Sequence, residues 1–372
     1  MIEVFLIKLV LAGIVFFAVL NFAGFHTWVE RKQSALIQDR IGANRAAIFG
    51  FRFLGLFHGI ADAVKLFTKE DIVPARADRT LHTLAPFFSV FFALVAFAAI
   101  PFGDRLAIGG TVVELQVAKI DVSLLYVFAM LSLGVYGVIL AGFASRSNYA
   151  ILGGLRATAQ LISYEIAMGI SIIGVVMVYG TMDLAELVRA QGQRAGGWLP
   201  LWGIVTQPLA FIIFVTAALA ETKRVPFDLP EGESEIVGYF VEYSGMKFGM
   251  FLLTDFLDTI LVACLATTLF FGGWQVPFLE RGGLEAGAAQ AAFHFPWGTV
   301  ISVPHLVYVL LGVASFSLKV VVFCWLFMQL RWTLPRFRYD QLMSLGWKGL
   351  FPVAVVNVVV TAAVLVLLGE AS

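Results

Sequence analysis

Six acidic side chains crowd into one short segment between two strongly hydrophobic stretches. They are Glu221, Asp228, Glu231, Glu233, Glu235 and Glu242. An ionised carboxylate at membrane depth costs on the order of 3 kcal/mol, so acids in such a place line a polar path or pair with cations. The crowding therefore points first to proton handling.

Four further ionisable side chains lie inside hydrophobic stretches: Glu165, Asp255, Asp258 and Lys319. A carboxyl group that is out of reach of bulk water, as Glu165 is expected to be, is a candidate for proton exchange. The alternative for Glu165 is a structural hydrogen bond to a neighbouring helix. The other three either continue a polar path or neutralise one another.

The elements that must position these groups are membrane helices. The chain has 372 residues, of which 60% are hydrophobic and 13% charged. A spanning helix needs roughly 20 apolar residues, and eight stretches reach that length: 2–26, 82–103, 121–143, 157–180, 202–220, 248–272, 305–330 and 349–368. The sequence thus predicts an all-α polytopic bundle with eight transmembrane helices plus amphipathic cytoplasmic helices, in one integral membrane domain over 1–372.

Most Lys and Arg residues lie in the loops after the first, third, fifth and seventh stretches. The opposite side has only Arg105, Lys119, Arg189, Arg194 and Arg281. Positively charged loops stay on the cytoplasmic side. We therefore expect a multi-pass membrane protein with both termini on the outer side.

Two loops are too long to be simple turns. In the cytoplasmic loop 28–81, the side chains of 53, 60, 64 and 67 are apolar and fall on one helix face, whereas those of 58, 62, 65 and 69 are polar and fall on the other. This predicts an amphipathic helix along the membrane surface. Its polar face either meets water and headgroups, with Asp62 and Lys65 as an ordinary pair, or forms a wall of a polar cavity.

The second long loop is the acidic segment 221–247, which we expect to lie in the cytoplasm or at the membrane interface. Pro226 and Pro230 prevent the preceding helix from continuing. Asp228 followed by Glu231 is typical of a helix start, and a helix beginning there places Glu231, Glu235 and Glu242 on one face. A solvated acidic loop is the alternative, which fits poorly with the apolar residues of the same segment.

No redox centre is indicated. Cys264 and Cys324 are isolated in apolar stretches, and the five His residues show no ligand spacing, so we expect no metal, haem or iron–sulfur group on this chain. The pairs Gly153-Gly154 and Gly272-Gly273 fall at predicted helix ends and indicate loops there rather than a nucleotide motif.

Five motifs together resemble a known family. They are WVERK at 28–32, DRIG at 39–42, ADAVKL at 61–66, ETKRVPFDLPEGESE at 221–235 and LPRFRYDQLM at 334–343. With the eight-helix pattern, they resemble the H subunit, the quinone-chamber membrane subunit of bacterial respiratory complex I, the proton-pumping NADH:quinone oxidoreductase. The resemblance spans nearly the whole chain, and the long acidic string is its most specific part.

The resemblance implies a membrane subunit without a redox centre that forms much of the quinone chamber. It also implies the bacterial cytoplasmic (inner) membrane as its location, so that the outward-facing termini would lie on the periplasmic side. It implies a quinone path along Arg31, Arg45, Asp62, Lys65 and Phe227. It also implies a proton relay that couples quinone reduction to proton translocation. The relay acids would be Glu165, Glu221, Glu231, Glu233, Glu235 and Glu242.

The same resemblance implies quinone as substrate, with flavin and iron–sulfur clusters held by partner subunits rather than by this chain. The implied partners are soluble peripheral-arm subunits at the quinone site, membrane-arm subunits and lipid, and nothing indicates nucleic acid. The sequence departs from the family pattern at Gly42-Ala43-Asn44 and His58-Gly59, in Asp255 where a Glu is usual, and in one residue fewer between Glu235 and Glu242.

Two other functions would also need buried acids. An autonomous cation/proton secondary transporter is one, although the interrupted paired helices expected at an inverted-repeat site are not evident. The membrane subunit of an energy-converting hydrogenase is the other, in which a similar scaffold docks a redox arm without quinone. A purely structural anchor would leave Glu165 unexplained.

Overall fold

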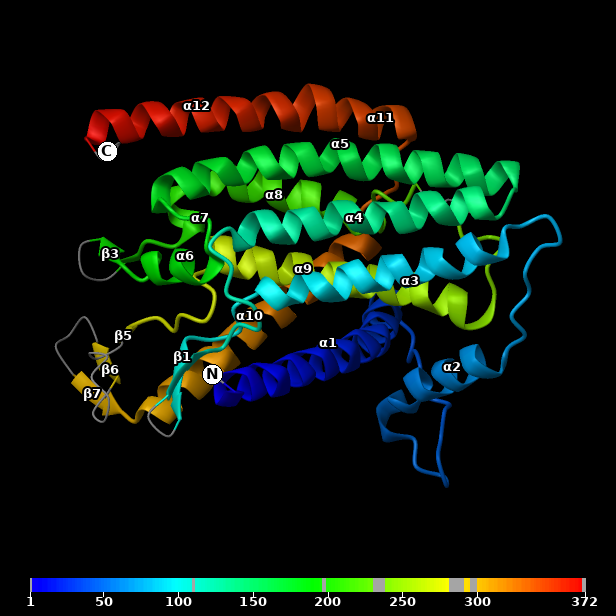
Figure 1. The fold of residues 1–372 in the computed structure, drawn as a ribbon, viewed down its shortest axis with the longest axis horizontal. Helices are drawn as coiled ribbons and strands as arrows, with labels where there is room; N and C mark the ends of the chain where they lie inside the picture. Colours follow the sequence, from blue (N-terminus) through cyan, green and yellow to red (C-terminus); the bar gives the residue numbers. More distant parts are fainter. Residues whose placement is uncertain are drawn as a thin grey trace.

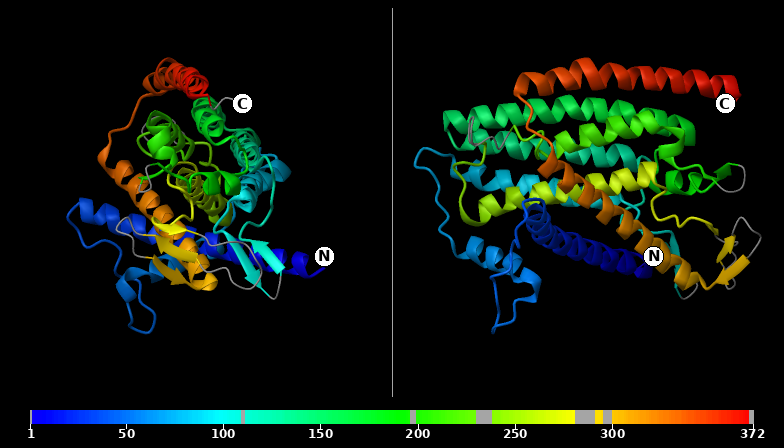
Figure 2. Two further views of the ribbon diagram at one scale, coloured as in Figure 1. Left: turned by 90° about the vertical axis from the view of Figure 1, so that its left-hand side faces the viewer. Right: turned by 180° about the vertical axis from the view of Figure 1, so that it is seen from behind.

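The chain folds into stacked layers of long helices that run roughly side by side (Figure 1, Figure 2). The structure is a computed structural model and describes residues 2–108, 111–195, 199–229, 238–280, 291–294 and 300–369. In chain order the elements are α1 (Ile2–Ile37), η1 (Phe53–Gly55), α2 (Phe57–Thr68), α3 (Arg79–Ala96), η2 (Phe97–Ala99), β1 (Arg105–Ile108), β2 (Thr111–Glu114), α4 (Ser123–Ala144), α5 (Asn148–Tyr179), α6 (Leu184–Ala190), β3 (Arg194–Ala195), β4 (Leu199–Pro200), α7 (Gly203–Thr206), α8 (Pro208–Glu221), α9 (Gly245–Phe270), β5 (Leu279–Glu280), β6 (Ala291–His294), β7 (Val300–Val303), α10 (His305–Thr333), α11 (Tyr339–Ser344), η3 (Leu345–Leu350) and α12 (Phe351–Leu368).

Seven helices in the described ranges are long and apolar enough to cross a membrane. The predicted helical, multi-pass fold class is thereby confirmed, whereas the count of eight spans is not. The difference lies in the fifth predicted stretch, 202–220. It forms the short α7 and then the 14-residue α8, because the chain leaves helical geometry at Gln207 and Pro208 begins the next helix.

Helix α9 forms the centre of the bundle. Every residue from Thr254 to Phe270 is buried, and α9 packs against α1, α2, α3, α8 and α10. A helix that is apolar on all sides belongs in the interior of a bundle. By contrast, α1 and α12 lie at opposite outer faces (Figure 2) and leave most of their apolar side chains exposed. The acids of α9 are therefore held at the heart of the molecule.

Close helix contacts depend on glycine. A Cβ on Gly142 of α4 would lie 2.7 Å from the Ala150 carbonyl oxygen, and one on Gly153 of α5 would lie 2.9 Å from the backbone of Gly238. Such distances leave no room for a side chain. The prediction that Gly153-Gly154 marks a helix end is therefore wrong: both residues lie inside α5, where their small size lets neighbouring backbone approach.

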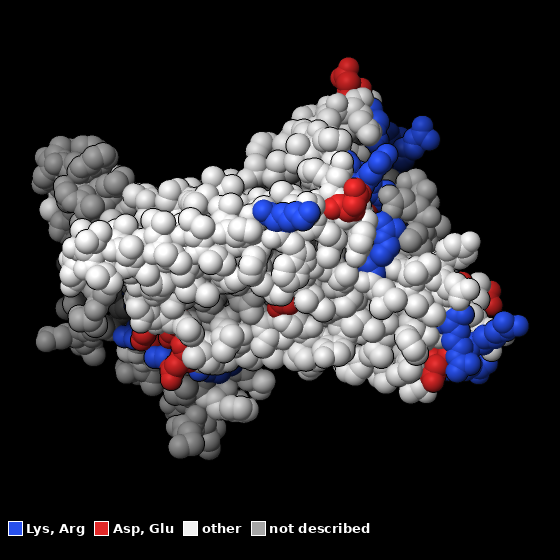
Figure 3. All heavy atoms as spheres, turned by 90° about the horizontal axis from the view of Figure 1, so that it is seen from above, with Lys and Arg blue, Asp and Glu red and all other residues white. Residues whose placement is uncertain are grey.

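The two ends of the bundle differ in character. Both chain termini and the small sheets lie at one end, and α2 lies at the other (Figure 1). In the face drawn in Figure 3, Lys and Arg side chains gather toward the end that carries α2. The helix predicted within the loop 28–81 forms as α2, preceded by the single turn η1, and its apolar side chains Ile60, Val64 and Phe67 are exposed. Its position along the membrane surface stays a prediction.

A charged network closes the end that carries the termini. In the antiparallel hairpin of β1 and β2, Arg105 pairs with Glu114, and its Nε lies 3.0 Å from Glu114 Oε1. Arg189 of α6 lies 3.4 Å from the same carboxylate and 3.3 Å from Asp104. Burial alone would raise the pKa of Glu114, but the hydrogen bond from Arg105 and the nearby charges of Arg189 and Lys119 outweigh it and lower that pKa.

Candidate functional site

The site is built where α8 ends and the chain turns back toward α9. Helix α8 ends at Glu221, and Lys223 takes a left-handed backbone conformation with φ +54°. This turn buries the side chains of Glu221, Lys223 and Arg224 instead of directing them to solvent. The polar string that the sequence places after a membrane helix therefore folds into the bundle.

Lys223 meets two acids from α9. Its ammonium nitrogen lies 3.0 Å from Asp255 Oδ1 and 3.8 Å from Asp258 Oδ2, and all three side chains are nearly inaccessible to solvent. Asp255 and Asp258 are one helix turn apart, so both carboxylates fall on the same face of α9. The acids that the sequence marks at depth thus neutralise a cation from the acidic string rather than Lys319.

Glu221 completes the cluster without a partner of its own. Its side chain is 4% exposed, and among the described residues nothing forms a hydrogen bond to its Oε2. Glu165 of α5 is close enough to repel its charge, while Glu165 itself accepts a hydrogen bond from the Ser132 hydroxyl of α4. Leaving a buried carboxyl oxygen unpaired is costly, which indicates that Glu221 binds a proton or a water molecule.

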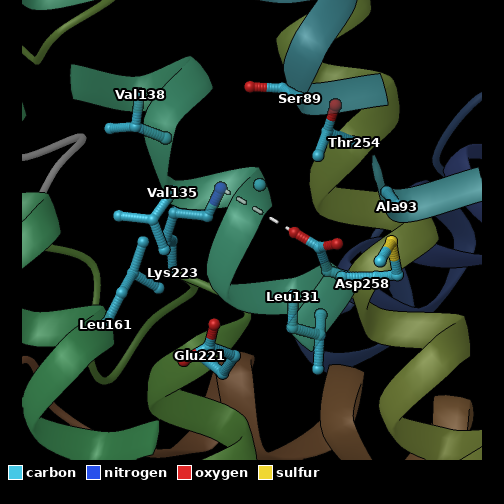
Figure 4. A pocket seen from close by; sticks show the side chains of 12 residues that line it. Ser89, Ala93, Leu131, Val135, Val138, Leu161, Glu221, Lys223, Thr254 and Asp258 are labelled. Carbon is cyan, nitrogen blue, oxygen red and sulfur yellow. Dashed lines mark ion pairs between the residues drawn. The ribbon is translucent and has the colours of Figure 1, made fainter. Parts of the chain in front are cut away.

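A small cavity lies between these groups. The centre of a water molecule can occupy about 20 Å³ of it, which is enough for one water. Its polar lining comes from Glu221, Lys223, Asp258, Ser89 and Thr254, and the rest is apolar. Figure 4 shows Lys223 and Asp258 facing each other across it, with Glu221 beside them.

This arrangement can store and exchange a proton. The carboxyl groups of Glu221 and Asp258 and the ammonium group of Lys223 line the same small cavity, and repulsion between closely spaced carboxylates in a low-dielectric interior is strong. The two carboxyl groups therefore act on each other when either gains or loses a proton. A water in the cavity would have donors and acceptors on several sides, as proton exchange requires.

A second buried ion cluster adjoins the first, and sequence reasoning missed it. Glu30 of α1 lies 3.0 Å from Arg224 and also pairs with Arg331 of α10, while the Arg224 guanidinium lies 4.1 Å from the centre of the Phe256 ring. The available signal was the acid inside the WVERK motif, next to basic residues at a helix end. Lys223, which was also missed, was the cation nearest to Glu221 within the acidic string.

Phe227 is part of the packed interior of the turn. Its side chain is 3% exposed and stacks on Phe337 with ring centres 5.4 Å apart. Gln160 of α5 donates hydrogen bonds of 2.7 Å to the carbonyl oxygens of Ala220 and Phe227. Arg336 pairs with Asp228 at 3.0 Å, so these contacts fix the start of the acidic segment against α5 and the stretch before α11.

The other predicted relay acids are only partly placed. Glu231, Glu233, Glu235 and the helix predicted to begin near Asp228 lie outside the described residues. Glu242 lies in a turn before α9, not on a helix, so the prediction that it shares a helix face with Glu231 and Glu235 is wrong. Its carbonyl oxygen lies 3.3 Å from His82 Nε2, because the chain turns there to enter α9.

The predicted quinone-path residues near α2 are partly brought together. Arg31 at the end of α1 forms an ion pair of 2.5 Å with Asp62. The backbone N–H of Arg45 donates to His58 Nε2 at 3.2 Å, and the side chains of Arg45 and Lys65 are exposed. This places the polar face of α2 against the end of α1.

Lys319 has a different environment from Lys223. Its ammonium group donates hydrogen bonds to the carbonyl oxygens of Phe271, Gly273 and Gln275, at 2.9, 2.9 and 2.7 Å. It also lies 4.7 Å from the centre of the Trp202 ring. These carbonyls directly follow α9, so Lys319 joins α10 to the end of the central helix.

Comparisons with known proteins identify the family. A family model described as NADH dehydrogenase matches residues 9–362. The chain is 42% identical over 367 residues to an NADH-quinone oxidoreductase H subunit of Cytophaga hutchinsonii, covering 98% of each chain. It is 44% identical over 362 residues to an H subunit of Geobacter metallireducens, covering 97% of each, and 43% identical over 365 residues to the H subunit of Thermomicrobium roseum, covering 96% of each. The chain therefore belongs to the family of NADH-quinone oxidoreductase H subunits, the multi-pass inner-membrane subunits of complex I.

Proposed function

We propose that this chain forms the membrane wall of the quinone chamber and carries a buried acidic relay that couples quinone reduction to proton translocation. In this role it holds no redox centre. Flavin and iron–sulfur clusters belong to partner subunits, and quinone is the substrate at the interface with soluble peripheral-arm subunits. Further membrane-arm subunits and lipid would cover the exposed apolar faces of α1 and α12.

The observation that carries this proposal is the unpartnered carboxyl of Glu221 beside a water-sized cavity at the centre of the bundle. Most buried polar groups in folded proteins have a hydrogen-bond partner, so a buried carboxyl oxygen without one calls for an explanation. Here Glu165 of α5 and Asp258 of α9 both act electrostatically on Glu221 of α8. They form a chain of exchangeable groups rather than an isolated structural pair.

Quinone reduction supplies the driving event. Converting a quinone to a quinol consumes two electrons and two protons, so protons must be delivered near the chamber. We propose that Arg31, Arg45, Asp62 and Lys65 lie along the quinone path at the α1–α2 surface and that Phe227 lies near it. Loss of protons from this region changes the charge balance felt by the buried acids, and the coupled set responds by taking up protons.

The test replaces single relay acids in the assembled complex. We expect Glu165→Gln and Glu221→Gln each to lower proton translocation coupled to quinone reduction by at least about tenfold, because a glutamine cannot exchange the proton. The same exchange at Glu235 tests the relay residue outside the described ranges. Translocation is measured in sealed membrane vesicles with a pH-sensitive dye while NADH is oxidised.

Glu186→Gln is the matched control, because Glu186 is an exposed glutamate of α6 at the opposite end of the bundle. NADH oxidation by ferricyanide, which bypasses the quinone site, reports assembly in every variant. Normal translocation in both Glu165→Gln and Glu221→Gln would refute the relay. Cation transport by the isolated chain in liposomes would favour a secondary transporter instead.

A further inference from the structure

Lys223 is the one Lys or Arg among the described residues that line the cavity. Its side chain is 5% exposed, and its backbone has φ +54°. A left-handed conformation is unfavourable for a residue other than glycine and persists where the surroundings hold it. The ion pairs with α9 hold it here, so the strained turn and the buried ammonium group form one feature.

The three acids around Lys223 are not equivalent. Asp255 makes the shorter contact, at 3.0 Å, and does not line the cavity, whereas Asp258 lies 3.8 Å away and does line it. Glu221 also lines the cavity, and its Oε2 has no partner in the described parts of the chain. Coulomb energy falls with distance, so the ammonium group compensates Asp255 most fully.

We propose that Lys223 is a positioning residue of the relay: its ammonium group is a fixed counter-charge that stays paired with Asp255 and leaves Glu221 and Asp258 to exchange the proton through the cavity. This inference rests on the proposed function and deepens it. In the exchange, a hydronium ion in the cavity transfers one proton to Glu221 Oε2 and becomes water. Release reverses the step, and no other reactant takes part.

Other charged groups bear on the cluster and belong in its charge balance. Glu165 of α5 acts on Glu221, Arg224 acts on Asp258, and the Tyr239 phenol acts on Lys223. Helices α3 and α4 line the cavity without an ionisable side chain, since α3 contributes Ser89 and Ala93, and α4 is apolar there. Lys223 is therefore the cation in closest contact with the α9 acids, and its removal takes away the positive charge that faces the cavity.

Three variants of the whole complex test this. Lys223→Asn removes the charge, and because asparagine tolerates the left-handed conformation well, it does not add backbone strain. Lys223→Arg keeps the charge. The double variant Lys223→Asn/Asp255→Asn removes one positive and one negative charge, so the net charge of the cluster equals that of the wild type.

The measurement is the pH profile of proton translocation in sealed vesicles between about pH 5.5 and 9, normalised to NADH–ferricyanide activity. We expect Lys223→Asn to shift the profile to higher pH by about one unit or more, because uncompensated carboxylates hold protons more tightly. Lys223→Arg should keep the profile close to that of the wild type. The double variant should move it back by at least about half of the shift.

An unshifted profile in an assembled Lys223→Asn complex would overturn the inference. So would a shifted profile that the double variant fails to restore, because a purely structural defect does not respond to charge balance. If Glu221→Gln abolishes translocation while the Lys223→Asn profile stays in place, only the role of Lys223 fails. If Glu165→Gln and Glu221→Gln also leave translocation intact, the proposed acidic relay is refuted together with the role of Lys223.

Discussion

The two buried lysines show how little residue type alone says about role. Lys223 faces carboxylates, which can gain and lose protons, whereas Lys319 faces three backbone carbonyl oxygens, which do not titrate over the working pH range. A cation near the end of a helix also interacts favourably with the helix dipole. Lys319 therefore fastens the end of α9 to α10, and we expect it to act on stability.

Lys319→Met should destabilise the protein without changing how many protons it moves. The variant removes three charge-assisted hydrogen bonds, and the net cost is on the order of 2 kcal/mol. Thermal inactivation of the purified complex would show the loss, as a lower midpoint than in the wild type. The number of protons moved per NADH should stay the same; a reduced number at permissive temperature would instead place Lys319 in the relay.

The sequence identified the buried acids but not the side chains with which they pair. Glu165, Glu221, Asp255 and Asp258 stand out because charge inside an apolar stretch is conspicuous. The pairing of Lys223 with α9 was not predictable, because more than thirty residues separate the partners and only the return of the chain brings them together. The assigned roles of these residues and of Glu231, Glu233 and Glu235 stay predictions.

At the scale of elements, α2 is an amphipathic helix whose polar face is tied to α1 by a single ion pair. Arg31 and Asp62 are both partly exposed, so the pair contributes about 1 kcal/mol or less. Its value lies in orientation: it fixes which side chains of α2 face the end of α1. Shifting this helix would move Arg45 as well, since its backbone bonds to His58.

Asp62→Ala should therefore impair quinone use before it impairs electron entry. We expect the apparent KM for quinone to rise about fivefold, the size of effect that corresponds to losing roughly 1 kcal/mol of positioning. Oxidation of NADH by ferricyanide in the same membranes should be unchanged. Equal loss of both activities would indicate failed assembly. Asp39→Asn in the loop after α1 controls for charge removal, because asparagine tolerates the left-handed backbone there, with φ +52°.

Hydropathy predicted which stretches form helices, but it predicted less well where those helices end. The prediction ended the first helix at residue 26, yet α1 continues to Ile37. The reason is tertiary: Glu30 pairs with Arg331, and Gln33 donates a 2.8 Å hydrogen bond to Gln329, so the polar end of α1 packs on the polar end of α10. The short β-hairpins were not predicted, because strands of two to four residues leave almost no periodic signal.

At the scale of the whole molecule, ion pairs and hydrogen bonds of charged side chains hold together the end that carries the termini. Lys8 of α1 donates a 3.0 Å hydrogen bond to the Glu114 carbonyl oxygen, and Tyr308 of α10 reaches Asp104 at 3.3 Å. With Arg189 of α6, these contacts join three helices through one hairpin. The Glu114 carboxylate itself meets Arg105, Lys119 and Arg189, so its ionisation affects the part of the network that holds α6 to the hairpin.

This charged network should stabilise the fold less at acidic pH. The ordinary pKa of a glutamate is near 4.5, and in the folded protein the pKa of Glu114 is lower. Ionised Glu114 therefore stabilises the fold fully at pH values above the ordinary pKa, and this stabilisation is lost as the pH falls through the lower pKa of the folded state. We expect the thermal midpoint of Glu114→Gln to lie below that of the wild type at neutral pH. The gap should shrink as pH falls below about 4.5; a gap that is the same at all pH values would contradict this.

The length of α8 has a consequence for the membrane itself. Fourteen residues at about 1.5 Å each span roughly 21 Å, whereas the hydrocarbon core of a bilayer is about 30 Å thick. A helix of this length that starts at one edge of the hydrocarbon ends before the other edge, which would place the charged turn inside the hydrocarbon. The short length of α8 thus sets how deep in the membrane the buried charges lie, and the longer neighbouring helices separate them from lipid. Lengthening α8 by one turn would lift the cluster about 5 Å toward the headgroups, where water could dissipate its field.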